Sequence, residues 1–151
     1  MLGRKSKYEK RDYLKQFKIG KATYSESLIY EAYGGLQNDG IMLAVYYDVD
    51  AAKIIHQLDS WEKINDSPTI SSILKNVSSY FGLDFVIPEI ASGNFFLYDN
   101  SQHKELRSEA EMNTLLLHSE DVNFSLVVWD DEKHTIYIVE YLSLIHISEP
   151  T

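Results

Sequence analysis

Two apolar runs separated by a turn-forming cluster occupy the first third of the chain. Residues 27–33 (SLIYEAY) are rich in strand formers, and residues 41–47 (IMLAVYY) are almost continuously apolar. The segment between them, GGLQNDG, combines glycine with Asn and Asp, the residue types that favour turns. The pattern predicts a β-hairpin whose second strand is central in its sheet. The expected turn residues are Gly34, Gly35, Asp39 and Gly40.

Apolar residues recur with helical spacing in the middle of the chain. One helical face is predicted from Ala51, Ile54, Ile55, Leu58 and Trp61. Asp48 or Asp50 is expected to cap this helix. A second helix is predicted over residues 66–79, with Pro68 in its first turn. Weaker helical patterns occupy two shorter segments, residues 8–17 and 109–117.

The last third of the chain is rich in strand patterns. Strands are predicted at residues 94–98, 123–129 and 135–141, the last two joined by a polar turn. The order of hairpin, helices and meander predicts an α+β fold. We expect one mainly antiparallel sheet, made of the N-terminal hairpin and a C-terminal three-stranded meander, with two or three helices packed on one face. Residues 22–141 would form this single domain.

Charge is distributed unevenly along the chain. The net charge of −9 divides into +6 for residues 1–21 and −15 for residues 22–151. Because so acidic a body repels phosphates, nucleic acid is not expected as a partner. The basic segment 1–21 is interpreted as a solvated terminus, with contact to an anionic surface or to the acidic body as the alternative.

The apolar runs are too short for a membrane span. No stretch of about 18 apolar residues occurs, and the N-terminal residues are too polar for a signal peptide. As written, the sequence predicts a cytoplasmic protein. A cell-envelope location is the expectation if an N-terminal part is missing.

The last ten residues, 142–151 (LSLIHISEPT), resemble a sequencing adapter translated in frame. The chain would then derive from environmental shotgun DNA. The alternative is a natural extension of the last strand. We therefore give no functional weight to these residues, His146 included.

The sequence offers few residues with the spacing of a catalytic or metal site. The glycine-rich turn leads into a strand and contains Asp39 where a phosphate-binding loop needs Lys, so a hairpin turn is favoured. Asp131 and Lys133 have the acid-x-Lys spacing of metal-dependent nucleases, but they lie in a polar hairpin turn. The chain has no Cys, and its histidines lack metal-ligand spacing. No catalytic residue, metal or cofactor is predicted.

Aromatic and acidic residues at the ends of predicted elements indicate a contact surface instead. Trp61 ends a helical face and Trp129 ends a strand, and core packing is the favoured interpretation of both. The residues proposed for a contact surface are Trp61, Tyr98, Asp99, Asp130 and Asp131.

Several short segments resemble an uncharacterised family of small proteins from Gram-positive bacteria. The segments are YEAYGG (30–35), DG (39–40), WEK (61–63), IPEI (87–90), GNFFLYD (93–99) and NFSL (123–126), with Asp130, Tyr137 and Glu140. The resemblance implies the same order of elements, and often a membrane or lipid anchor, but no known activity. The family's Asp-Thr-His and Asp-Arg-His are replaced here by residues 31–33 (EAY) and 99–101 (DNS).

These patterns lead to three functional hypotheses. The first is an acidic domain that acts by protein–protein contact, with an immunity-type inhibitor of a basic partner as its specific form. The second is a cell-envelope domain without its anchor in this sequence. The third is a hydrolase with a site built from loops, which predicts acidic residues of shifted pKa gathered in one cleft. The oligomeric state is left open.

Overall fold

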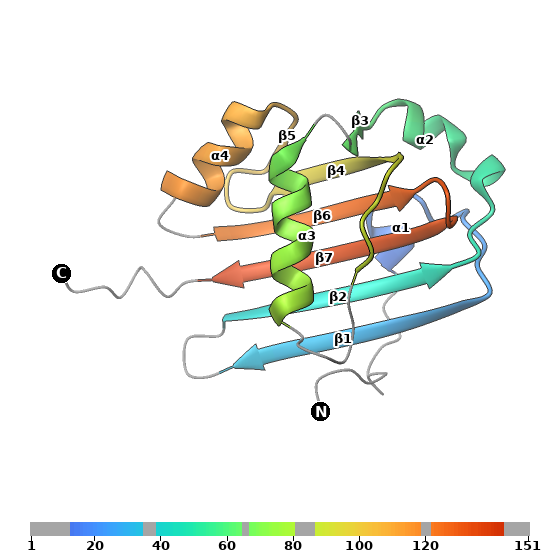
Figure 1. The fold of residues 1–151 in the computed structure, drawn as a ribbon, viewed down its shortest axis with the longest axis horizontal. Helices are drawn as coiled ribbons and strands as arrows, with labels where there is room; N and C mark the ends of the chain where they lie inside the picture. The colour runs from blue at the N-terminus through green and yellow to red at the C-terminus, as the bar shows by residue number, and fades with distance from the viewer. Residues whose placement is uncertain (1–12, 35–38, 65–66, 81–86, 119–121, 144–151) are drawn as a thin grey trace.

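A seven-stranded antiparallel sheet organises the protein, in the order β1-β2-β7-β6-β4-β3, with β5 also pairing with β4 (Figure 1). The computed structural model describes residues 13–34, 39–64, 67–80, 87–118 and 122–143. The strands are β1 (Glu26–Gly34), β2 (Asp39–Tyr47), β3 (Glu62–Lys63), β4 (Gly93–Asp99), β5 (Lys104–Leu106), β6 (Val122–Asp130) and β7 (Thr135–Ser143). The predicted α+β fold around one antiparallel sheet is therefore confirmed.

The N-terminal hairpin and the C-terminal meander join through β2 and β7. Gly34 ends β1, and Asp39 and Gly40 begin β2, so these three expected turn residues belong to the ladder instead, whereas Gly35 lies outside the described residues. Leu142 pairs with both Gly40 and Asn123, so β7 extends two residues past the expected strand end. Residues 144–151 lie outside the described part. The short strands β3 and β5 were not predicted.

At the starts of η1 and α3, polar side chains accept hydrogen bonds from backbone amides that have no partner within the helix. They are α1 (Tyr13–Gln16), η1 (Ala51–Lys53), α2 (Ile55–Asp59), α3 (Pro68–Tyr80) and α4 (Glu109–His118). Asp50 caps η1 by accepting a hydrogen bond from the Ala52 amide at 3.1 Å. Ser67 caps α3 by accepting from the Ile70 amide at 3.2 Å. The helix expected over residues 51–61 is divided into η1 and α2.

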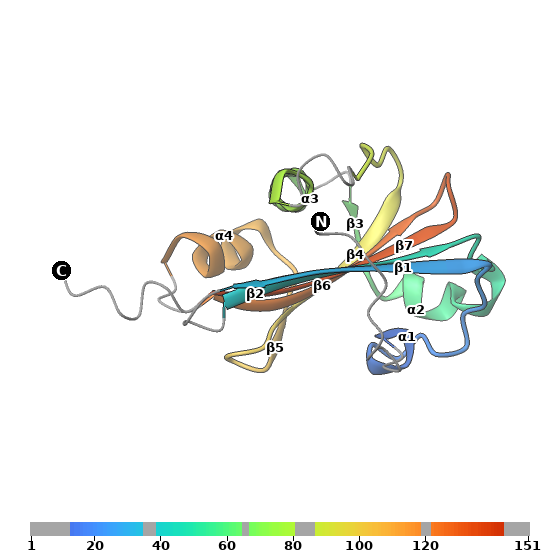
Figure 2. The same ribbon diagram turned by 90° about the horizontal axis from the view of Figure 1, so that it is seen from below.

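Helices cover both faces of the sheet, which corrects the expectation that they share one face. Figure 2 shows α3 and α4 on one side and α1 and α2 on the other. Alternate residues of β2 enter different cores, Leu43 and Val45 packing with α3, Met42 and Ala44 with α1 and α2. Because the central strands are apolar on both sides, each face must be covered from water.

Part of the basic N-terminal segment belongs to the domain. Tyr13, Leu14 and Ile19 are buried against the sheet in the same core as α2. The expected boundary at residue 22 therefore does not separate the two parts, because residues 13–21 supply apolar side chains to the fold. Residues 1–12 lie outside the described residues. Within the described chain, no helix has the length and apolar content needed to cross a membrane.

A carboxylate joins the first turns of α3 and α4. Glu109 accepts hydrogen bonds from the Ser67 hydroxyl and from the Thr69 hydroxyl, the latter at 2.6 Å. The Thr69 amide is 3.3 Å from the same carboxylate. Burial opposes ionisation of Glu109, but these hydrogen bonds outweigh it and lower the pKa of the carboxyl below its ordinary value of 4.5.

Replacement of Glu109 by Gln should lower stability at pH 7 by about 1 kcal/mol, the usual net value of a hydrogen bond. Because the folded pKa is lowered, the stabilisation is fully present above the unfolded value near 4.5. It is lost as the pH falls through the folded value. Urea unfolding at pH 7 and pH 3 measures this loss. The free energy of unfolding should differ less between the two pH values in Glu109→Gln than in the wild type. The same pH dependence of stability in the variant and the wild type would contradict the stabilising role of the Glu109 carboxylate.

Candidate functional site

A groove with an aromatic floor lies on the sheet face that carries α1 and α2. Figure 2 shows α1 and the β5 hairpin projecting from this same side of the sheet. The groove has a volume of about 550 Å³, and its aromatic lining is Phe17, Trp61, Phe96 and Tyr98. We call it the aromatic groove.

Three of these rings form a bent row with Phe96 in the middle, because β3 sets Trp61 beside Phe96 and Tyr98 follows Phe96 along β4. The Trp61 and Phe96 ring centres are 6.1 Å apart, and the Phe96 and Tyr98 centres are 6.3 Å apart. The interplanar angles are 32° and 16°, so the rings are roughly parallel. All three side chains are only half-buried. A row of large, partly exposed rings is the kind of surface that supplies most of the energy at protein contacts.

The alternation of β4 places two of the rings. Phe95 and Leu97 point into the α3 side, so Phe96 and Tyr98 point to the opposite face. Trp61 reaches the row because β3, which follows it directly, pairs with β4 through Glu62 and Phe95. The short strand β3 therefore completes a site from two segments that are distant in sequence.

Polar side chains continue the floor beyond the rings. The side-chain nitrogen Nδ2 of Asn100 donates to Asn123 Oδ1 and to Ser125 Oγ, both at 3.0 Å. An adjoining hollow of about 420 Å³ shares Gln16, Asn100 and Ser125 with the aromatic groove. In this hollow, Gln16 Nε2 donates to Glu140 Oε2 at 3.0 Å. Polar side chains therefore line much of the sheet face next to the rings.

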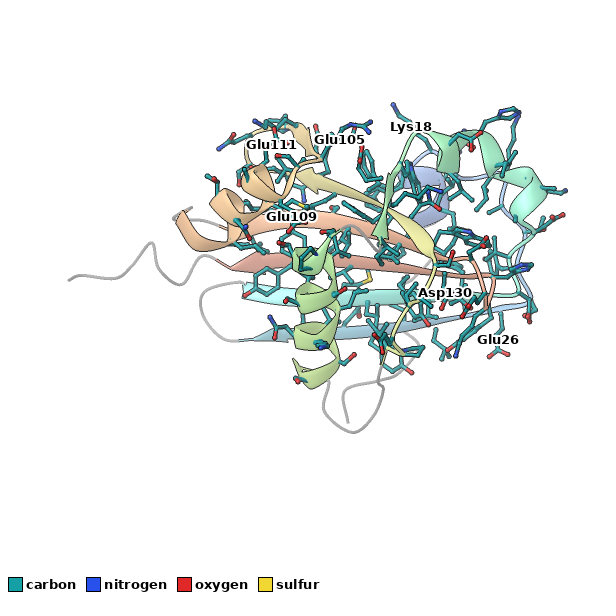
Figure 3. All side chains as sticks on the ribbon, turned by 45° about the horizontal axis from the view of Figure 1, so that its top comes forward. Lys18, Glu26, Glu105, Glu109, Glu111 and Asp130 are labelled. Carbon is teal, nitrogen blue, oxygen red and sulfur yellow. The ribbon has the colours of Figure 1, made fainter. Side chains whose placement is uncertain are left out.

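The charged groups of the aromatic groove are Lys18, Glu105 and Arg107, and Figure 3 labels the first two. Arg107 lies between two carboxylates, with Nη1 2.8 Å from Glu62 and Nη2 2.6 Å from Glu105. These exposed ion pairs add little stability, but they hold the guanidinium in place. Lys18 makes no ion pair with any described residue.

The structure brings together two of the five residues proposed for a contact surface. Trp61 and Tyr98 both line the aromatic groove. Asp99 and Asp130 are 3% and 1% exposed, so their assignment to a surface is wrong. Asp131 is exposed but lies in a different hollow, where it accepts a hydrogen bond from Trp129 Nε1 at 3.3 Å. Trp129 itself is buried, as its position at a strand end predicted.

The two buried aspartates organise turns. Asp99 Oδ1 accepts from the amides of Ser101 and Gln102 at 2.9 and 3.2 Å. Asp130 Oδ1 accepts from the amides of Glu132 and Lys133 at 3.0 and 3.2 Å. Each carboxylate thus satisfies backbone groups that would otherwise lack a partner.

Asp130 has a second oxygen, Oδ2, that is buried without a hydrogen-bond partner in the described part of the chain. The negative charge of Asp130 is close enough to Tyr137 of β7 to affect the pKa of the Tyr137 hydroxyl. Burial raises the pKa of the Tyr137 hydroxyl, and the negative charge of Asp130 raises it further. Figure 3 shows Asp130 far from Lys18 and Glu105, so it does not belong to the aromatic groove.

Replacement of Asp130 by Ala should lower the free energy of unfolding by about 2 kcal/mol, because the Glu132 and Lys133 amides both lose their acceptor. Asp130→Asn keeps Oδ1 and removes the buried charge, so we expect it to retain most of the wild-type stability. Thermal or urea unfolding of the two variants measures the difference. Equal losses in both would show that the charge, and not the Oδ1 acceptor, stabilises the turn.

Within the described residues, no group of three or more His, Asp or Glu side chains is arranged to hold a metal ion. His56 and His103 are exposed, and the His134 ring stacks on Trp129 with centres 5.6 Å apart. The acid-x-Lys pair Asp131 and Lys133 is in the exposed β6–β7 turn, the place that the sequence predicted.

No family model, curated protein or solved structure matches the chain.

The aromatic groove was only partly predictable. The sequence indicates Trp61 and Tyr98 as contact residues, but it does not indicate Phe96, Lys18, Glu105 or Arg107. The signal for Phe96 was present in β4, where its alternation with Phe95 and Leu97 puts it on the face of Tyr98.

Proposed function

We propose that this protein is a binding domain that contacts a protein partner through the aromatic groove. The observation that carries the proposal is the row of half-buried rings, Trp61, Phe96 and Tyr98, in an open groove. Trp, Tyr and Arg are the residue types that dominate protein-binding surfaces, and Arg107 lies at the edge of this row. The polar floor beyond the rings supplies hydrogen bonds.

The charge of the chain favours a partner with a basic surface. The chain carries a net charge of −9, which accelerates encounter with a cationic protein by long-range attraction. An immunity-type inhibitor of a basic partner is the specific form of this proposal. It is consistent with the resemblance to the uncharacterised Gram-positive family, which carries no known reaction.

The positions of the shifted carboxylates support binding over hydrolysis. A loop-built hydrolase site predicts acidic groups of shifted pKa in one cleft. Hydrogen bonds from the backbone amides of Arg107 and Ser108 lower the pKa of Glu111, and Glu109 is lowered by its contacts with α3. Both residues begin helix α4, and neither lines the aromatic groove.

A capture experiment with matched variants tests the proposal. The wild-type protein and the variants Trp61→Ala, Tyr98→Ala and Ile55→Ala are immobilised, and bound proteins are quantified by mass spectrometry. Ile55 is 46% exposed and lies in a different hollow, so its variant controls for loss of apolar surface. We expect each ring variant to reduce capture of a specific partner about tenfold. A partner retained equally by all variants would exclude the groove as its site.

A further inference from the structure

We propose that the protein forms a symmetric dimer through the outer edge of β1, with a second copy of this chain on that edge. Strand β1 of one protomer pairs antiparallel with β1 of its partner, which joins the two sheets into one. The inference goes beyond the proposed function, because the rings of the aromatic groove belong to the opposite, β3–β4 end of the sheet.

The edge at β1 has none of the irregularities that commonly protect a sheet edge. Its residues pair with β2 one for one from Glu26 to Gly34, so the strand contains no bulge. It contains no Pro, Lys or Arg. Figure 1 shows β1 as the outermost strand, and no described strand pairs with its outer side. A long, regular edge of this kind offers a row of backbone N–H and C=O groups to another strand.

The opposite edge of the sheet is built differently. There β4 pairs with β3 and β5, which contain two and three residues. All but one of these residues are charged, namely Glu62, Lys63, Lys104 and Glu105. Short, charged strands protect an edge against further pairing. Within the described sheet, the edge without this protection is β1, so we expect the second copy there.

The apolar residues of β1 match one another when the strand pairs with a copy of itself. With the two-fold axis between the two Ile29 side chains, Leu28 faces Tyr30 of the partner subunit. Leu28 is half-exposed, and Tyr30 packs against the core on the α3 side. Ile29 belongs to the core on the α1–α2 side. The pairing therefore extends both cores across the dimer and removes apolar surface of Leu28 from water.

The carboxylates of β1 avoid one another in the same register. Glu31 faces Ser27 of the partner subunit, and Glu26 faces Ala32 of the partner subunit. A shift of the axis by one residue, to Tyr30, brings the two Glu31 side chains onto diagonal positions, where they repel each other. The register centred on Ile29 is therefore the one that we expect.

The net charge of −9 on each chain opposes the dimer at long range. Backbone hydrogen bonds and apolar contacts hold the two strands together at short range, and salt screens the repulsion. The dimer should therefore become tighter as salt is raised. Binding of a basic partner by long-range attraction should weaken under the same change, so salt distinguishes the two kinds of contact.

Sedimentation equilibrium of the full chain tests the dimer. The wild-type protein is measured over a series of concentrations, at low and at high salt. We expect a monomer–dimer equilibrium whose dissociation constant falls as salt is raised. A monomer at every concentration, or a dimer that salt dissociates, would overturn the inference.

A charge placed at Ser27 tests the register, because this half-exposed residue faces Glu31 of the partner subunit. Ser27→Lys creates two equivalent pairs of opposite charge and should tighten the dimer about threefold to tenfold. Ser27→Glu creates two like-charge pairs and should weaken the dimer by about the same factor.

Ser101→Lys and Ser101→Glu are the matched controls for these variants. They change the net charge equally at an exposed turn residue between β4 and β5, far from β1 in the order of the sheet. Circular dichroism confirms that each variant is folded. If the Ser27 variants change the dissociation constant no more than their Ser101 counterparts, the proposed pairing of β1 is wrong.

Hydrogen exchange locates the interface without any substitution. Amides on the outer side of β1 should exchange more slowly at concentrations that favour the dimer, whereas those of β3 should not change. Trp61→Ala, which alters the aromatic groove, should leave the dissociation constant of the dimer unchanged. Slower exchange at β3 with none at β1 would place the contact at the other edge and overturn the inference.

Discussion

Replacement of Gly93 by Ala should lower the free energy of unfolding by about 4 kcal/mol or leave the protein unfolded. A Cβ atom at this position would lie 1.9 Å from the carbonyl oxygen of Trp129. The clash is with backbone and not with a flexible side chain, so it can be relieved only by moving β4 away from β6. Gly93 pairs with Asp130 in that ladder, at the edge of the β6–β7 turn. Losses of this size occur where a substitution forces apart well-packed backbone.

Gly20→Ala is the matched control for this prediction. A Cβ at residue 20 would lie 3.2 Å from the Cα of Lys15 and 3.3 Å from its Cβ. A shift of a few tenths of an ångström at the end of α1 removes this contact, so we expect a change within about 1 kcal/mol. Urea unfolding followed by circular dichroism compares both variants with the wild type. Similar midpoints for Gly93→Ala and the wild type would show that β4 and β6 are not so closely paired.

The two tryptophans should respond very differently to replacement by Ala. Trp129 is among the largest fully buried side chains, and its loss should lower stability by about 3–5 kcal/mol. Trp61 is half-buried over the aromatic groove, so its loss should cost about 1 kcal/mol or less.

Circular dichroism is the appropriate measurement for this pair, since each substitution removes a fluorescent reporter. The comparison also separates a folding role from a binding role. A Trp61→Ala variant that is as unstable as Trp129→Ala would mean that Trp61 belongs to the core. In that case, its effect on partner capture would no longer locate a site.

The longer elements were predictable because their signals are local. The apolar run of β2, the alternation in β7 and the capped apolar face of α3 each occupy nine or more residues. The hairpin and the meander follow from the turn residues between such runs.

The features that were missed depend on contacts between distant segments. β3 and β5 contain two and three residues, too few for any periodicity, and they exist because β4 offers them a free edge. The second helical layer requires the short helix α1, whose pattern is weak. Asp99 and Asp130 resemble exposed acids in the sequence, because nothing in it shows that nearby amides will enclose one carboxylate oxygen.

The aromatic groove was the least predictable feature for the same reason. Trp61 and Phe96 are separated by a helix and an irregular segment, and only the β3–β4 pairing makes them neighbours. The charged edge depends on Arg107 reaching Glu62 across a similar separation.

The position of the sheet between two separate cores has a consequence for protein engineering. Consecutive residues of β2, such as Met42 and Leu43, belong to opposite layers. The β4 positions that line the aromatic groove can therefore be varied while the α3–α4 layer keeps its original packing. Libraries confined to alternate positions of β4 would change the lining of the aromatic groove and leave the core on the α3–α4 side unchanged.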